Sequence, residues 1–121
     1  MRNLTKHIVE GDSANHQLGV YVLDEPGHGG ACHKYNIMHA ETELCGLSFQ
    51  NGPIKAGFGV NGITHEALLA ILIDRMEGFQ AGPYASQDNA DALNHMNLAL
   101  ASLQLRTRAR RARGVEGTHT V

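Results

Sequence analysis

Five arginines gather near the end of the sequence, and their type and spacing fit the binding of phosphate groups. Arg106, Arg110 and Arg113 recur at i, i+4 and i+7, which places them on one face of a helix, with Arg108 and Arg111 on a neighbouring face. A guanidinium group can hold a phosphate through two parallel hydrogen bonds. The same residues would also suit a solvated helix end, where the helix dipole favours cations. Spacing alone leaves both interpretations open.

The charge of the chain is divided unevenly. Residues 1–105 carry five Lys/Arg and eleven Asp/Glu, a charge of −6, whereas residues 106–121 carry five Arg and one Glu, a charge of +4. A confined basic patch on an acidic protein argues against general coating of nucleic acid and favours a small anionic ligand. A nucleic-acid-binding oligomer that uses the Arg106–Arg113 stripe is kept as an alternative.

A second candidate site lies where two predicted helices meet. Phe79 and Asn89 flank the expected turn, with Gln80, Tyr84 and Ser86 between them. An aromatic ring can stack on a nucleobase, and an amide can read the edge of the base. The alternative is that Phe79 belongs to the core and Asn89 is an ordinary polar residue near a helix start.

Catalytic and metal chemistry find little support in the residue pattern. Cys32, His33, His39 and Cys45 form the one cluster of soft ligands, but adjacent Cys-His does not match zinc spacing. Ser48, Cys45 and His39 are candidate catalytic groups without a recognisable base and orienting partner. We therefore expect a binding protein with no catalytic residues, no metal and no cofactor.

The elements that must position these residues fall into two halves. Alternating β-formers predict strands over residues 19–24, 32–38 and 44–50. Asn51-Gly52 resembles a hairpin turn, and residues 55–60 could form the returning strand. The first half is therefore expected to be a small antiparallel sheet.

The second half has the signals of two helices. Thr64 is a suitable N-cap for a first helix, which Gly82-Pro83 would end. Ser86 is a suitable cap for a second helix, which would run to about Arg113 and stop at Gly114. Because the connection is short, the two helices must fold back as an antiparallel hairpin.

Taken together, these signals predict an α+β protein, with a small N-terminal antiparallel β-sheet followed by a C-terminal antiparallel two-helix hairpin. We expect a single domain over residues 1–121, with a β-rich part at 1–62, the hairpin at 63–113 and a tail at 114–121. Leucines of the second helix fall on two faces, which either the sheet or further copies of the chain could cover.

The expected compartment is the cytoplasm. The sequence has no run of 18 apolar residues, and its N-terminal stretch 1–11 lacks the apolar core of a secretory signal. Cys32 and Cys45 do not make a disulfide framework. No membrane association is expected.

Several motifs together resemble one phage protein family. They are Phe49-Gln-Asn-Gly-Pro-Ile-Lys55, Gly59-Val-Asn-Gly-Ile-Thr-His-Glu-Ala-Leu-Leu69, Asp74-Arg75, Gly78-Phe-Gln-Ala-Gly-Pro83 and the C-terminal Arg106-Thr-Arg108 with Arg113-Gly-Val-Glu-Gly-Thr-His-Thr-Val121. The resemblance covers residues 17–121 and is to the Thoeris anti-defence sponge family, which shares its helical hairpin with a phage anti-CBASS sponge. It implies a protein of the infected bacterial cytoplasm that sequesters glycocyclic ADP-ribose, the signal of Thoeris immunity, without cleaving it. A hydrolase of the same signal is the alternative.

The resemblance also implies site residues and an assembly. By position, Phe79 corresponds to a base-stacking phenylalanine and Asn89 to a ligand-contacting asparagine, while Asn51 is expected to line the same pocket. Arg106 and Arg110 correspond to arginines that hold the phosphates of CBASS cyclic di- or trinucleotides at a separate site. Family members form dimers or hexamers, so we expect a homo-oligomer. The acidic, tryptophan-containing segment that relatives carry in the second helix is absent here from Leu98 to Leu105.

Overall fold

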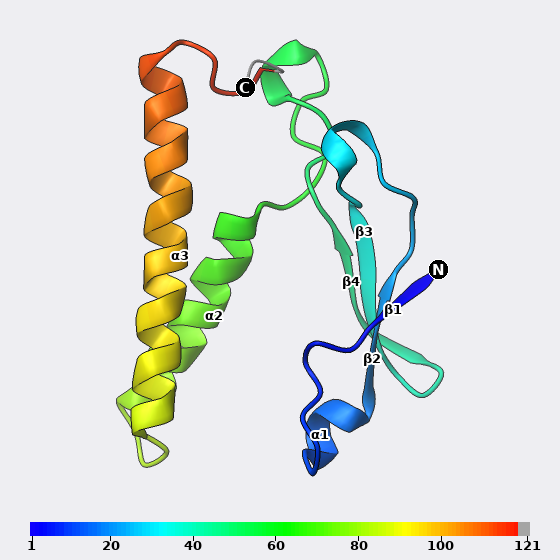
Figure 1. The fold of residues 1–121 in the computed structure, drawn as a ribbon, viewed down its shortest axis with the longest axis vertical. Helices are drawn as coiled ribbons and strands as arrows, with labels where there is room; N and C mark the ends of the chain where they lie inside the picture. Colours follow the sequence, from blue (N-terminus) through cyan, green and yellow to red (C-terminus); the bar gives the residue numbers. More distant parts are fainter. Residues whose placement is uncertain (119–121) are drawn as a thin grey trace. The chain divides into compact units, whose positions relative to one another are not determined.

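The structure is a computed structural model that describes residues 1–118, and it contains a sheet followed by a helical hairpin (Figure 1). The strands are β1 (Arg2–Leu4), β2 (Leu18–Val22), β3 (Lys34–His39) and β4 (Thr42–Ser48); the α-helices are α1 (Ser13–His16), α2 (His65–Gln80) and α3 (Gln87–Ala112); and the short 3-10 helices are η1 (His28–Gly30) and η2 (Ile54–Ala56). The predicted α+β class, with its sheet before its hairpin, is confirmed.

The sheet is a four-stranded antiparallel meander in the order β1-β2-β3-β4. Its central pair, β2 and β3, places Val20 opposite Ile37, and the β3–β4 pairing shifts register between Ile37 and Met38. Among the residues whose burial the structure describes, Val22 at the end of β2 is the most deeply buried, with 1% of its surface exposed. The three strands predicted from alternation are therefore present, with ends that differ by a few residues.

The predicted returning strand over residues 55–60 is wrong. Pro53 has no N–H to give to a sheet, and the chain after it forms the 3-10 helix η2. Gly57 then takes a left-handed conformation, with φ 92°, which ends η2 and turns the chain away from an extended path.

Asn51-Gly52 consequently bends the chain without making a β-hairpin. The Asn51 N–H donates to Oδ1 of Asn61, and Nδ2 of Asn61 donates to the Asn51 carbonyl, both at 2.7 Å. The Asn61 carboxamide thus fastens the two ends of this loop in place of a strand pair.

The helical hairpin begins and ends where the sequence predicts. The Thr64 hydroxyl accepts the Ala67 N–H, and the Ser86 hydroxyl accepts the Asn89 N–H, each at 3.1 Å. At its C-terminus, α3 stops at a Gly114 with φ 74°, the left-handed residue that commonly closes a helix. Helices α2 and α3 pack against each other as an antiparallel pair (Figure 1).

The chain divides into two compact units. The first contains residues 1–52 and 60–62, and the second contains residues 53–59 and the chain from 63 onward. Our expectation of a single domain stays a prediction. Among residues 1–118, no helix is both long and apolar enough to cross a bilayer.

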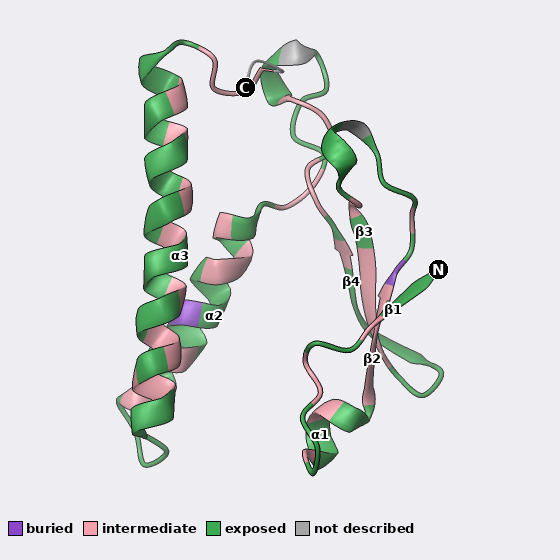
Figure 2. Cartoon of the chain, viewed as in Figure 1, coloured by how far each residue is buried: buried purple, intermediate pink, exposed green. Residues whose placement is uncertain are grey.

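The hairpin buries little of its apolar surface on its own (Figure 2). Ile73 of α2, with 8% exposed, is the one buried hydrophobic side chain in the described part of the second unit. Large apolar side chains that stay exposed on the two helices are Ile71, Leu72, Leu98 and Leu105. Patches of this kind are typical of interaction surfaces.

Candidate ligand site at the hairpin turn

The Gln80 side chain bridges the turn between α2 and α3. The Gln80 carboxamide donates to the Ser86 carbonyl and accepts the Ser86 N–H, both at 3.1 Å. Ser86 also caps α3 through the Asn89 N–H. Phe79 and Asn89 therefore project from helix ends whose separation is fixed by this pair of hydrogen bonds. Sequence reasoning named Gln80 only as a residue of the turn, because a bond six residues apart has no periodic signal.

Phe79 is half-buried and lies among polar and aromatic neighbours. The guanidinium carbon of Arg75 lies 4.9 Å from the centroid of the Phe79 ring, and the ring of Tyr84 lies at 6.3 Å with a 60° tilt. Tyr84 itself is 72% exposed. A half-open ring with a cation over it and an exposed tyrosine beside it can accept a flat aromatic ligand.

Asn89 keeps most of its hydrogen-bonding capacity. Its Nδ2 donates to the Tyr84 carbonyl at 3.4 Å, and its Oδ1 meets no donor among residues 1–118. An amide in this state offers one acceptor oxygen and one further N–H to a ligand. Phe79 and Asn89 are thus brought to the same turn, as the resemblance implies.

An open hollow adjoins Phe79 on helix α2. Its volume is about 540 Å³, and five residues from one face of the helix line it: Ile71, Asp74, Arg75, Gly78 and Phe79. The hollow contains both an apolar surface and a cation, the combination that a nucleotide requires.

The arginines predicted to hold cyclic oligonucleotides lie far along α3 from this turn. Asn89 and Arg106 are separated by 17 positions, which at 1.5 Å per residue is about 25 Å. Within one chain, a small ligand cannot contact both. Arg106 is exposed and has no hydrogen-bond partner or ion pair among residues 1–118.

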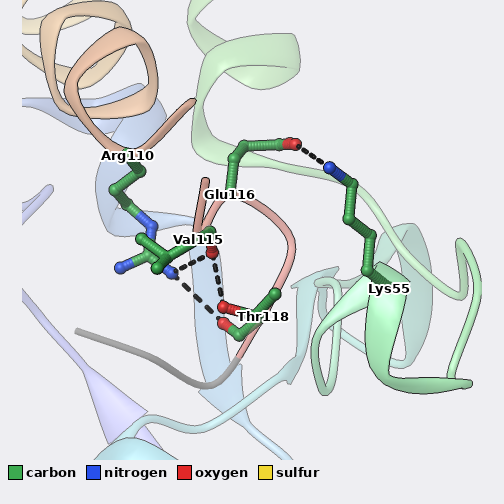
Figure 3. Close-up of polar contacts among 5 residues, drawn as sticks. All are labelled: Lys55, Arg110, Val115, Glu116 and Thr118. Carbon is green, nitrogen blue, oxygen red and sulfur yellow. Dashed lines mark hydrogen bonds and ion pairs between the residues drawn. The ribbon is translucent and has the colours of Figure 1, made fainter. Parts of the chain in front are cut away.

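Arg110 has a structural contact that the sequence did not indicate (Figure 3). Its Nη2 donates to the carbonyls of Val115 and Thr118, each at 3.1 Å. The other guanidinium nitrogens, Nη1 and Nε, meet no acceptor in the described part of the chain. Arg110 therefore binds the tail through Nη2, and its Nη1 and Nε groups remain available to donate to an anion.

The tail that Arg110 holds also contacts Lys55 of the 3-10 helix η2 (Figure 3). The Lys55 N–H donates to the Gly117 carbonyl at 2.8 Å, and its ammonium lies 3.3 Å from a carboxylate oxygen of Glu116. Gly117 has φ 76°, and an added Cβ would lie 2.9 Å from the Lys55 side chain. Both the turn and this close approach favour glycine.

Asn51 lies in the first unit, apart from the hairpin turn in the chain's division. It lines a hollow of about 240 Å³ whose other residues are His33, Lys34, Ser48, Phe49 and Asn61. The edge of one ring meets the face of the other where Tyr35 packs against Phe49, at 5.6 Å between centroids. The expectation that Asn51 lines the ligand pocket stays a prediction.

The residues considered as soft metal ligands do not form a metal site in the described structure. Residues 1–118 contain no group of three or more His, Cys, Asp or Glu side chains placed to hold a metal ion. Cys32 and Cys45 are both free thiols.

Comparison with known proteins matches the same part of the molecule. The family model of the Acb2/Tad1 hairpin domain matches residues 47–108, which include all of α2 and most of α3. A protein of Bacillus phage SBSphiJ7, "Thoeris anti-defense 1", is 38% identical over 93 residues, which are 77% of this chain and 65% of that protein. The chain thus spans just under two thirds of the length of this curated relative.

The fold and the site define a class of protein built on a helical hairpin that carries an aromatic ring and an amide at its turn. The extent of the family match places the chain within a known group. The chain belongs to the Acb2/Tad1 hairpin-domain family. The resemblance to the Thoeris anti-defence family, inferred from the motifs, is confirmed.

Proposed function

We propose that this chain is a phage anti-defence protein that binds and sequesters a cyclic ADP-ribose-type signal, glycocyclic ADP-ribose, in the cytoplasm of the infected bacterium. Family membership and the name of the phage relative support the anti-defence role. The observation that carries the ligand assignment is the hairpin turn, where Gln80 bonds to Ser86 between Phe79 and Asn89, and where Phe79 lines an open hollow.

The chemistry of this ligand matches the groups at the turn. Adenine can stack on the flat apolar ring of Phe79. The polar edge of adenine can form hydrogen bonds with the Asn89 carboxamide, whose oxygen has no partner among residues 1–118. A pyrophosphate needs a cation or oriented N–H donors when it leaves water. A protein that sequesters a signal competes with the effector by affinity alone, so it requires no turnover.

A second site at Arg106 and Arg110 would bind the phosphates of CBASS cyclic di- or trinucleotides. Its support is the open guanidinium of Arg106, the free edge of Arg110 and their spacing of one helical turn. Because this pair lies about 25 Å from the turn along α3, both ligands could bind one chain at once.

The assembly would be a homo-oligomer, a dimer or a hexamer. The apolar side chains left exposed on α2 and α3 support it, because a second copy of the hairpin could cover them. Repetition around a symmetry axis would also bring several arginines to one anion.

Calorimetry with glycocyclic ADP-ribose tests the proposed function. Wild-type protein is expected to bind, and Phe79→Ala to weaken binding by about 1–3 kcal/mol of lost stacking, roughly 5- to 150-fold. Phe58→Ala is the matched control, since Phe58 is a 54% exposed phenylalanine of the same unit that lies outside the hollow. Absence of heat with every isomer and with cyclic oligonucleotides would refute the proposal.

The two alternatives make different predictions. A hydrolase of the signal would release new products, which chromatography detects. A nucleic-acid-binding oligomer would bind duplex with an affinity that falls steeply as salt increases.

A further inference from the structure

Gly78 occupies a position in helix α2 where the fold itself gives no reason for a glycine. It lies inside the helix, two residues before the last helical residue, and its φ is not in the left-handed range. An added Cβ would meet nothing within 4 Å. Because glycine destabilises a helix interior relative to alanine, its presence here favours a reason outside the chain's own packing.

The space left by Gly78 opens into the hollow beside Phe79. Asp74 and Arg75 lie one turn earlier on the same face, and Ile71 lies about one turn before them. A glycine at such a place lets another molecule approach the helix backbone closely. Gly78 and the ring of Phe79 thus line the same hollow side by side.

Arg75 is the cation of this hollow, and the ring of Phe79 holds it in place. Its guanidinium carbon lies 4.9 Å from the ring centroid. No carboxylate or carbonyl among residues 1–118 accepts its N–H groups. The positioned guanidinium thus keeps its hydrogen-bond donors for an anion that arrives from solution.

We propose that Gly78, Arg75 and Asp74 complete the Phe79 site for a purine nucleotide that carries a diphosphate. The missing side chain at Gly78 admits the flat ring against the α2 backbone, and Arg75 pairs with a phosphate. The Asp74 carboxylate accepts hydrogen bonds from ribose hydroxyls, a role that carboxylates fill in other nucleotide sites. This inference rests on the proposed function and adds three residues to it.

Gly78→Ala is the sharpest test, because it should raise stability while it lowers affinity. The melting temperature is expected to rise by about a few degrees, as alanine is the better helix former. Affinity for glycocyclic ADP-ribose, measured by calorimetry, is expected to fall at least about tenfold, because the new methyl group takes the place of a ring that packs against the α2 backbone. Gly82→Ala is the control: it adds the same methyl group one turn later, outside the hollow.

Arg75→Gln tests the phosphate contact separately. Affinity for glycocyclic ADP-ribose is expected to fall about tenfold or more, whereas binding of adenosine, which has no phosphate, should stay unchanged. Lys6→Gln is the control for net charge, since Lys6 is exposed and belongs to the first unit.

The outcomes separate this inference from the function on which it rests. If wild-type protein binds no ligand, the proposed function fails. If wild-type protein binds and both Gly78→Ala and Arg75→Gln bind equally well, the proposed function stands and the inference is overturned. A Gly78→Ala protein with unchanged affinity but a changed oligomeric mass would assign Gly78 to a contact between helices and also overturn it.

Discussion

Replacing Arg110 by glutamine should release the C-terminal tail from the end of α3 without unfolding the helix. In the wild type, one guanidinium nitrogen of Arg110 donates to the carbonyls of Val115 and Thr118. The tail is also tied to η2 by the Lys55 N–H, which donates to Gly117 at 2.8 Å. Loss of the Arg110 contacts should therefore be detected at Lys55.

The expected magnitude follows from the kind of contact that is lost. A hydrogen bond from a charged group contributes about 1.5–3 kcal/mol when buried, and Arg110 is half-buried, so we expect about 2 kcal/mol for the two together. That free energy corresponds to roughly a 30-fold change in the equilibrium for opening the tail. The ion pair between Lys55 and Glu116 is 63% and 35% exposed, so it adds less than about 1 kcal/mol. Arg110, rather than this ion pair, should dominate the docking of the tail.

Amide hydrogen exchange measures the opening directly. In Arg110→Gln, the amides of Lys55 and Thr118 should exchange roughly 30-fold faster, while amides in the middle of α3 keep their protection. Arg111→Gln is the matched control, because Arg111 is exposed and its side chain makes no hydrogen bond or ion pair among residues 1–118. Equal exchange at Lys55 and Thr118 in the wild type and in Arg110→Gln would refute this account of the tail.

Two further predictions concern the sheet and the assembly. Desolvation raises the pKa of Asp24, but the N–H groups of His33 and Lys34 donate to its carboxylate and lower the pKa below its ordinary value. The free energy of unfolding should therefore hold above pH about 4 and decline as the pH falls from there through the lowered pKa, and Asp24→Asn should make this decline smaller in a denaturation series. On α3, Leu105 is 66% exposed, and Leu105→Glu should reduce the mass measured by light scattering if the hairpins pack together, whereas an unchanged mass would place the interface elsewhere.

The sequence predicted those parts of the fold that depend on local signals. Thr64 and Ser86 mark helix starts because a hydroxyl at that position satisfies a free backbone N–H. The strands around Val22 and Ile37 follow from alternation. By contrast, β1 has three residues and α1 has four, too few to show a period, and neither was predicted.

The strand predicted after Asn51-Gly52 does not form, for a physical reason that lies in the sequence itself. Pro53 and Gly57 bracket a segment with β-forming residues, and those two residues disfavour a paired strand. What fastens the loop is the side chain of Asn61, ten residues from Asn51. Side-chain to backbone contacts at such separations have no signature in residue spacing.

In the candidate site too, some features have a local sequence signal and others do not. The place of Phe79 and Asn89 beside one turn could be predicted, since a short connection brings two helix ends together. The cation of Arg75 over the Phe79 ring, and the hold of Arg110 on the tail, depend on side-chain conformations that packing decides. Residue spacing carries no signal for either contact.

The central claim is that the protein binds the immune signal and keeps it intact. Its most direct test is to mix the protein with glycocyclic ADP-ribose, isolate the protein by gel filtration, release the bound material by heat and identify it by chromatography. We predict that intact glycocyclic ADP-ribose is recovered from the wild type and much less from Phe79→Ala. Recovery of cleaved products, or of no ligand from the wild type, would contradict the claim.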